Sequence, residues 1–350
     1  MNRYKIFSIF FIVHLFILNT QKLYPQSFYF LTLRPGIKAN AMGGAQAALV
    51  NDYQSFYYNP AGLARIKKGC LGFSNTHYNF LGYENKLNFG SVAYRMNKLG
   101  VFGFALYSFA NEINENQTIY QNSFQLSFGK TVSNNIHFGI SIKYLRQNYF
   151  SKKSHLFSGD IGLLLENILP VSTIKLLLPE FTKRFNRYKK KDFKGISLGL
   201  SLLNTGPGKT IYPASVTEPI SQILNLGIGY KLLESDLFSV TSAFDFNKNL
   251  VKIKDGKEDH FLKAWFSSWK DRVFDGLHAG CDFNLFYLFS IYLGYEKFYS
   301  LESDDKDDFT FGFSIGPDYA HIEVFYRTYP TFLPEPDRKK IWRFGFSIAY

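Results

Sequence analysis

The feature that most constrains the fold of this chain is a repeated alternation of large apolar residues with small or polar ones. In the stretch NSFQLSFGKT, every second side chain is large and apolar: Phe124, Leu126 and Phe128. The same pattern recurs in DFTFGFSIG, which begins at Asp308, and in WRFGFSIAY, which ends at Tyr350. Because successive side chains of a β-strand point to opposite faces, this alternation predicts strands with one apolar face.

The alternating segments predict an all-β chain of about fourteen strands. Each has roughly ten residues, which is the length that a tilted strand needs to cross a bilayer. The predicted strands lie near residues 70–79, 84–95, 99–108, 121–132, 136–147, 157–167, 195–204, 222–231, 237–247, 276–285, 287–298, 308–316, 320–329 and 340–350.

The strands of a secreted β-sandwich or propeller would alternate in the same way. The lengths of the connections between strands distinguish these folds from a membrane barrel. Connections after even-numbered strands are short, as around Asn97 and Asn134, whereas several after odd-numbered strands are longer and polar, as at 110–121 and 151–156. Short turns at one end and long loops at the other are typical of outer-membrane barrels. A sheet in lipid must also close, since a free edge would leave backbone groups without partners. We therefore predict a membrane-spanning antiparallel β-barrel with both termini in the periplasm.

The N-terminal residues are predicted to be a secretory signal peptide, residues 1–26. Arg3 and Lys5 precede an apolar run from Ile6 to Leu18, which is too short to span a bilayer comfortably. An N-terminal membrane anchor is the alternative. The net charge of +12 lies mainly in the connections. For an exported chain this charge favours anionic lipid headgroups as partners over nucleic acid.

A basic insertion, residues 168–194, interrupts the pattern of short turns. Apolar residues recur in it at helical spacing with basic residues around them, and Pro179 would kink such a helix. We predict a helix at the periplasmic membrane surface; a solvated basic loop is the alternative. The residues predicted to contact lipid are Phe181, Lys183, Arg184, Phe185 and Arg187.

The segment 27–67, ahead of the predicted barrel 68–350, does not alternate. Gly43 and Gly44 suit tight turns, and Pro60 ends regular structure. Asn59 before proline favours an extended or turn conformation. A segment of this composition is predicted to fold back into the barrel lumen as a plug.

One part of this segment, AMGGAQAALVNDYQSFYYNPAGLA, resembles the N-terminal signature of the PorV/PorQ family, a branch of the FadL-like outer-membrane barrels. The later segments SGDIGLLL and LSLLNTGPG are also similar to that family, through Asp160 and Asn204. The basic insertion departs from the family pattern. The matching residues of the signature are Met42, Gly43, Gly44, Ala45, Asp52, Asn59, Pro60, Ala61 and Gly62.

The resemblance implies a fourteen-stranded barrel with an N-terminal plug and a role in protein export. A PorV-type component of type IX secretion would bind or shuttle cargo, with a translocon and cargo C-terminal domains as partners. The alternative is a FadL-like transporter of long-chain fatty acids or other hydrophobic small molecules. Outer-membrane lipid is the partner common to both interpretations.

No residue pattern points to an enzyme, a cofactor or a metal site. The seven histidines are dispersed, and Cys70 and Cys281 are too few for a disulfide scaffold or a cysteine-based zinc site. His137, Asp160 and Ser141 would be a conceivable triad, but chance proximity is the better explanation. Charged residues predicted to line the lumen are Lys143, Asp160, Glu166 and Asp245.

Overall fold

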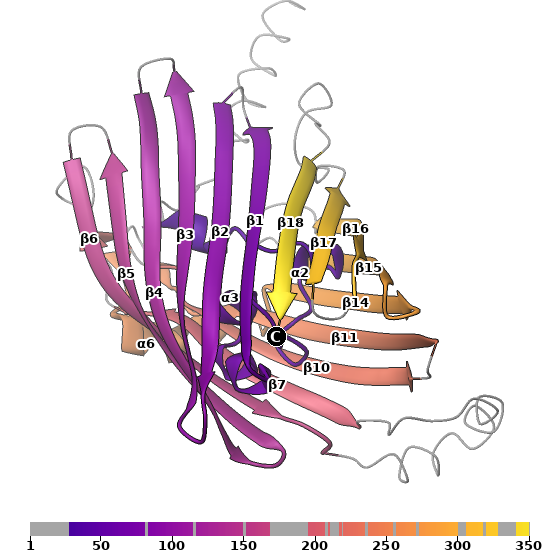
Figure 1. The fold of residues 1–350 in the computed structure, drawn as a ribbon. Helices are drawn as coiled ribbons and strands as arrows, with labels where there is room; N and C mark the ends of the chain where they lie inside the picture. The colour runs from indigo at the N-terminus through magenta and orange to yellow at the C-terminus, as the bar shows by residue number, and fades with distance from the viewer. Residues whose placement is uncertain are drawn as a thin grey trace, which may run out of the picture.

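The protein is a closed antiparallel β-barrel. The computed structural model describes residues 28–80, 83–114, 117–149, 152–168, 195–206, 209–210, 217–218, 220–234, 237–254, 257–270, 273–299, 306–317, 320–327 and 341–349. Within these residues, fourteen strands form the barrel, and β1 pairs with β18 to close it (Figure 1). The predicted strand number and the closure of the sheet are confirmed. The predicted signal peptide and residues 169–194 of the basic insertion lie outside the described residues.

The barrel strands follow one another around the wall in chain order. The two small hairpins, β8–β9 and β12–β13, do not belong to the barrel sheet. The barrel strands are β1 (Gly69–Phe80), β2 (Tyr83–Met96), β3 (Gly100–Asn114), β4 (Gln117–Ser133), β5 (Ile136–Tyr149), β6 (Lys152–Leu165), β7 (Ile196–Thr205), β10 (Ile223–Glu234), β11 (Phe238–Asn249), β14 (Gly276–Leu285), β15 (Phe289–Phe298), β16 (Lys306–Ile315), β17 (Ala320–Arg327) and β18 (Ile341–Ala349). The hairpins are β8 (Lys209–Thr210) with β9 (Thr217–Glu218), and β12 (Ile253–Lys254) with β13 (Lys257–Glu258).

The wall is apolar outside and polar inside. Leu126 of β4 is 65% exposed and Phe309 of β16 is 74% exposed, whereas the neighbouring Gln125 and Thr310 are buried in the interior. A soluble barrel would have the reverse arrangement, since water favours polar side chains outside. An apolar outer band with a polar interior suits a barrel in hydrocarbon, as the alternation predicted.

The two ends of the barrel differ. Tight connections follow β2, β4 and β14, and Asn97, Gly100 and Phe286 adopt positive φ angles there. These connections define the short-turn end, where β1 begins beside the last residues of β18. The opposite end is called the mouth. It carries α6 (Phe261–Ser267) and η3 (Ser268–Lys270), which follow β11. None of the helices in the described part of the chain has the length and hydropathy that crossing a bilayer requires.

The predicted long loops at 110–121 and 151–156 are wrong. Both stretches belong mainly to strands, since β3 and β4 have 15 and 17 residues and β6 begins at Lys152. Strands of this length exceed the 9–11 residues or so that a bilayer crossing needs. The extra residues pair through polar contacts between strands, such as Lys86 Nζ to Glu112 Oε1 at 2.7 Å. Their lack of an apolar face made them resemble loops.

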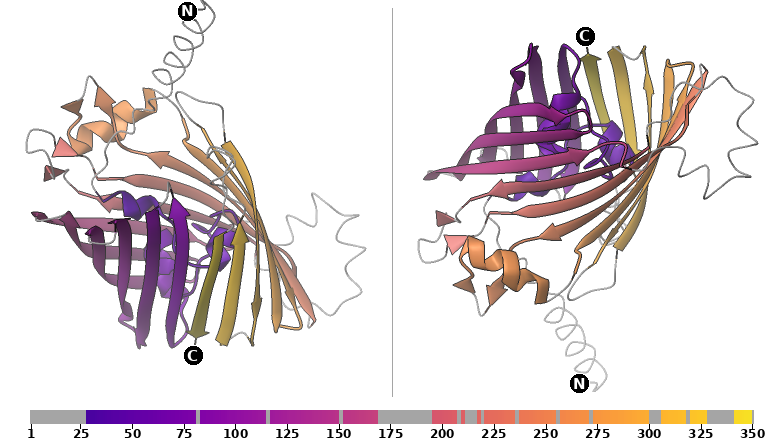
Figure 2. Two further views of the ribbon diagram at one scale, coloured as in Figure 1. Left: turned by 90° about the horizontal axis from the view of Figure 1, so that it is seen from above. Right: turned by 90° about the horizontal axis from the view of Figure 1, so that it is seen from below.

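The segment from Phe28 to Ile66 lies inside the barrel, and both views in Figure 2 show its short indigo helices enclosed by the strands. It forms short helices: η1 (Tyr29–Thr32), α2 (Lys38–Ala41), α3 (Ser55–Tyr58) and η2 (Pro60–Arg65). Glycines of the wall let its backbone approach closely. A side chain at Gly139 would overlap with Pro60, and one at Gly199 would overlap with Ala47. This part of the chain is called the inner segment below.

Candidate functional site

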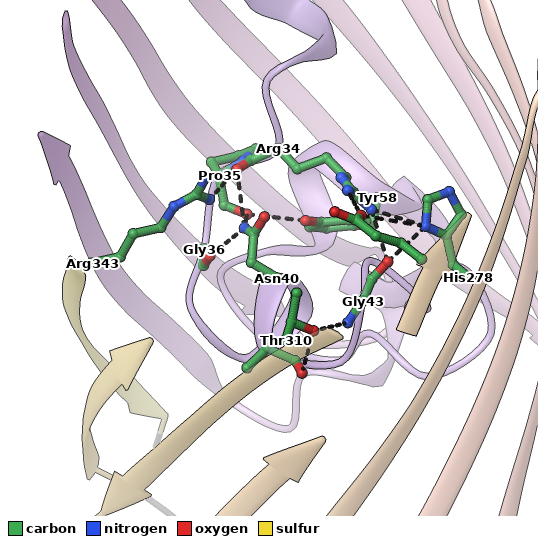
Figure 3. Close-up of polar contacts among 11 residues, drawn as sticks. Arg34, Pro35, Gly36, Asn40, Gly43, Tyr58, His278, Thr310 and Arg343 are labelled. Carbon is green, nitrogen blue, oxygen red and sulfur yellow. Dashed lines mark hydrogen bonds and ion pairs between the residues drawn. The ribbon is translucent and has the colours of Figure 1, made fainter. Parts of the chain in front are cut away.

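The candidate site is the lumen together with the inner segment that fills part of it. The Gly43–Gly44 turn has φ angles of 66° and 90°, a conformation that only glycine adopts without strain. The Gly43 N–H donates to Thr310 Oγ1 of β16 at 3.1 Å. The Gly43 carbonyl accepts from Arg34 Nη1 at 2.9 Å (Figure 3). The turn therefore contacts the wall through its backbone.

An ionic cluster fixes the same turn from the other side. Arg34 forms a salt bridge with Glu296 of β15, whose side chain is 1% exposed. The Nδ1 atom of His278, on β14, lies 2.6 Å from the Gly43 carbonyl oxygen and 3.1 Å from Arg34 Nη1. It donates to the carbonyl when it carries the proton, and it accepts from the guanidinium in the other tautomer. Arg343 of β18 donates to the Arg34 carbonyl at 2.7 Å. The turn itself thus contacts β14 and β16, and Arg34 beside it contacts β15 and β18.

Asn59 links the second half of the signature to the wall. Its Oδ1 accepts the Ala61 N–H at 3.0 Å, so that it caps η2, which begins at Pro60. Its Nδ2 donates to the carbonyls of Ala47 at 2.8 Å and Leu163 at 3.2 Å. Asn59 therefore holds both a local turn and a contact with β6.

The other signature residues have local or packing contacts. Asp52 Oδ1 accepts the Gln54 N–H at 2.8 Å, just ahead of α3. Met42 is fully buried, and its Sδ accepts from Gln46 Nε2 at 3.1 Å. A side chain at Gly62 would lie 2.5 Å from the Val50 carbonyl oxygen. The structure thus brings the signature residues together inside the barrel. The predicted lipid-contact residues Phe181, Lys183, Arg184, Phe185 and Arg187 lie outside the described residues.

We expect Asn59→Leu to lower the stability of the folded barrel by about 2 kcal/mol, because a cap and two further hydrogen bonds are lost. Asn59→Ser keeps an oxygen that can cap η2, and it should cost less. The measurement is the temperature at which the band of the folded form disappears, when samples are brought to increasing temperatures before gel electrophoresis. Equal midpoints for wild type and Asn59→Leu would contradict this role.

Of the predicted lumen charges, Lys143, Asp160 and Asp245 are buried in the interior, and Glu166, just beyond β6, lies 2.9 Å from Arg65 Nε in a salt bridge. Lys143 Nζ lies 2.9 Å from Asp160 Oδ1 and donates to Asn204 Oδ1 at 2.6 Å. Asp245 Oδ2 accepts the N–H groups of Gln46 and Ala47, each at 2.7 Å. These charges hold the wall and the inner segment in place.

Asp160 and Asn204, which carry part of the family resemblance, contact each other directly. The Asn204 N–H donates to Asp160 Oδ1 at 2.8 Å, and Asn204 adopts a φ of 57°. Here the register between β6 and β7 shifts, and β7 ends one residue later, at Thr205. The pair therefore stabilises a bulge in the wall.

The conceivable catalytic triad does not form. His137 contacts Thr131 and Glu166, Asp160 contacts Lys143, and Ser141 contacts Ser127. Among the described residues, no group of three or more His, Cys, Asp or Glu side chains is arranged to hold a metal ion. Cys70 and Cys281 are not joined in a disulfide.

An aromatic cluster inside the lumen was missed from the sequence. Phe30 of the inner segment contacts Tyr107 of β3 with ring centroids 5.1 Å apart, and Tyr57 contacts the same ring at 6.0 Å. The signal is present in β3, where Tyr107 and Phe109 fall out of phase with the outward Phe104. The cluster comprises Phe28, Phe30, Leu31, Tyr57, Tyr58, Phe89, Tyr107, Phe109 and Leu145, among others.

Comparison with known proteins finds similarity in three dimensions only. No family model and no curated protein matches the sequence. Among solved structures, the Ralstonia pickettii toluene transporter TbuX matches 90% of this chain and 98% of its own, with a TM-score of 0.52 at 11% identity. The fold is that of the FadL-type outer-membrane barrels.

Two further FadL-type structures agree. The monoaromatic hydrocarbon channel CymD has a TM-score of 0.52 at 12% identity, covering 90% of this chain and 97% of its own. A Pseudomonas aeruginosa FadL homologue has a TM-score of 0.51 at 11% identity, covering 90% and 98%. TbuX is named as a transporter and CymD as a channel, and neither is named as an enzyme.

Proposed function

We propose that this chain is an outer-membrane channel for hydrophobic small molecules. The observation that carries the proposal is the aromatic cluster around Tyr107, in which apolar side chains of the wall and of the inner segment pack together inside an otherwise polar lumen. A hydrophobic solute that takes the place of inner-segment side chains in this cluster leaves water and gains about 25 cal/mol per Å² buried. The FadL-type fold and the names of its neighbours support the same function.

The inner segment is proposed to act as a plug in this channel. Its helices lie across the lumen, and its polar contacts reach wall strands on opposite sides, such as β6 through Asn59 and β16 through Gly43. A solute that enters at the mouth reaches the aromatic cluster before η2. The outer-membrane location, and the periplasmic position of the short-turn end and both termini, belong to this proposal. The start of β1 lies beside the end of β18, so the first and last barrel strands begin and end at the same end of the barrel, which supports this placement of the termini.

The test is uptake of toluene by cells whose outer leaflet contains lipopolysaccharide, since toluene crosses plain phospholipid too readily to need a channel. We expect cells that produce the chain to take up toluene several-fold faster than cells without it. Tyr107→Gln should remove much of this gain, because it places an amide in the aromatic cluster. A matched control is Tyr94→Gln, since Tyr94 faces outward on the neighbouring strand. Equal uptake with and without the chain would contradict the proposal.

Protein export of the PorV type remains a prediction from the resemblance. It rests on the signature that includes Gly43 and Asn59, and the comparisons add no support for a translocon or for cargo. If the chain serves export, toluene uptake should be the same with and without it. Deletion of the chain should then leave cargo in the periplasm.

A further inference from the structure

A row of polar side chains crosses the inner wall on the mouth side of the aromatic cluster. Gln121 of β4 pairs with Gln147 of β5, which pairs with Ser154 of β6, so the three lie side by side. All three face the interior, with exposures of 8%, 6% and 6%. Neighbouring positions of this kind lie about 5 Å apart, within reach of one small ligand group.

The oxygen atoms of this row have no hydrogen-bond partner in the described part of the chain. They are Gln121 Oε1, Gln147 Oε1 and Ser154 Oγ. Leaving a buried polar atom unpaired costs about 1–3 kcal/mol, so a native fold rarely contains several side by side. Such a row points to a group that binds there and supplies the missing hydrogen bonds.

Apolar residues border the row on the same face. Phe109 pairs directly with Gln121 across β3 and β4. Leu145 and Leu156 lie two positions from Gln147 and Ser154 on their own strands, and both pack in or against the aromatic cluster. A ligand bound at the row would therefore place its apolar part on these side chains.

The charged side chain of Lys143, near the row, already has partners. Lys143, two positions beyond Leu145 on β5, lies 2.9 Å from Asp160 and donates to Asn204. Among the described side chains around the row, an ionised carboxylate would find no unpaired cation, and it would bring only acceptors to the unpaired oxygens. A hydroxyl group both donates and accepts, so it matches a glutamine amide in either orientation.

We propose that the row Gln121–Gln147–Ser154 binds the hydroxyl group of an uncharged amphiphile whose apolar chain packs against Phe109, Leu145 and Leu156. This inference rests on the proposed function, and it specifies the ligand: a hydrophobic molecule with a neutral hydrogen-bonding head. A pure hydrocarbon would leave the row unpaired, and an ionised fatty acid would lack the donor.

The test is equilibrium binding of radiolabelled 1-dodecanol, n-dodecane and dodecanoate to the full chain in lipid nanodiscs, with binding to empty nanodiscs subtracted. We expect wild type to bind dodecanol about tenfold more tightly than the other two, since each hydrogen bond made at the row contributes severalfold. The double variant Gln121→Leu/Gln147→Leu should abolish this preference and leave dodecane binding unchanged. Ser154→Ala, which removes one oxygen atom, should reduce it about threefold.

The matched control is Asn122→Leu, which makes a similar change next to Gln121 on the opposite, outward face. It should leave the dodecanol preference intact. Equal binding of dodecanol and dodecane by wild type would overturn the inference while leaving hydrophobe binding, and thus the proposed function, standing. An equal loss in Asn122→Leu would also overturn it. Absence of specific binding of all three probes would overturn both proposals.

Discussion

Replacing Gly139 or Gly199 with leucine is expected to expel the inner segment from the lumen. The added side chain would overlap with backbone atoms of Pro60 or Ala47, which cannot rotate away as a flexible side chain would. Overpacking of this kind costs about 1–3 kcal/mol or more, so the population of the open form should rise about fivefold or more. Trypsin would then cut after Lys38 or Arg65, which lie inside the folded barrel.

The measurement is the rate of tryptic cleavage within the inner segment of intact, membrane-embedded protein. Gly90→Leu is the matched control, because the nearest atom to an added Cβ there is 3.6 Å away. It should be cut as slowly as wild type. If Gly139→Leu and Gly199→Leu stay protected while the barrel remains folded, the close contact between inner segment and wall is not what holds the segment.

Arg34→Leu is expected to destabilise the folded barrel by about 3–5 kcal/mol, the typical effect of leaving a buried charge without its partner. Glu296 is almost fully buried, and Arg34 is its salt-bridge partner. The double variant Arg34→Leu/Glu296→Leu should recover much of the loss, since it removes the stranded charge as well. The measurement is the midpoint of thermal unfolding in detergent.

The control for this prediction is Lys86→Leu, which breaks an exposed salt bridge with Glu112 on the outer face. It should change the midpoint little, because water solvates the remaining carboxylate. A double variant no more stable than Arg34→Leu would show that Arg34 acts through its contacts with Gly43 and not through Glu296.

The barrel itself was predictable because its physical cause is local. A strand in lipid needs an apolar residue at every second position, and residues such as Leu126 and Phe309 show this directly. The extensions of β3 and β4 beyond the bilayer were not predictable in this way. Both of their faces are polar there, and pairing with a neighbouring strand, as between Lys86 and Glu112, decides their structure.

The interior was predictable only in part. The family resemblance selected Gly43, Asn59 and Asp160, and each makes a specific contact in the lumen. The partners of these residues, such as Thr310, come from strands far away in the chain. The row at Gln121 was not recognised, because two glutamines and a serine on separate strands have no spacing that marks them before the register is known.

The contacts of the inner segment with β16 and β18 have a consequence for the order of assembly. The hydrogen bond from Arg343 to the Arg34 carbonyl joins residues 309 positions apart, and that from Gly43 to Thr310 spans 267. Contacts of such high sequence separation form late, because the intervening chain must first lose its conformational entropy. The part of the protein that is synthesised before the barrel is therefore expected to reach its native environment last, once the final strands have inserted.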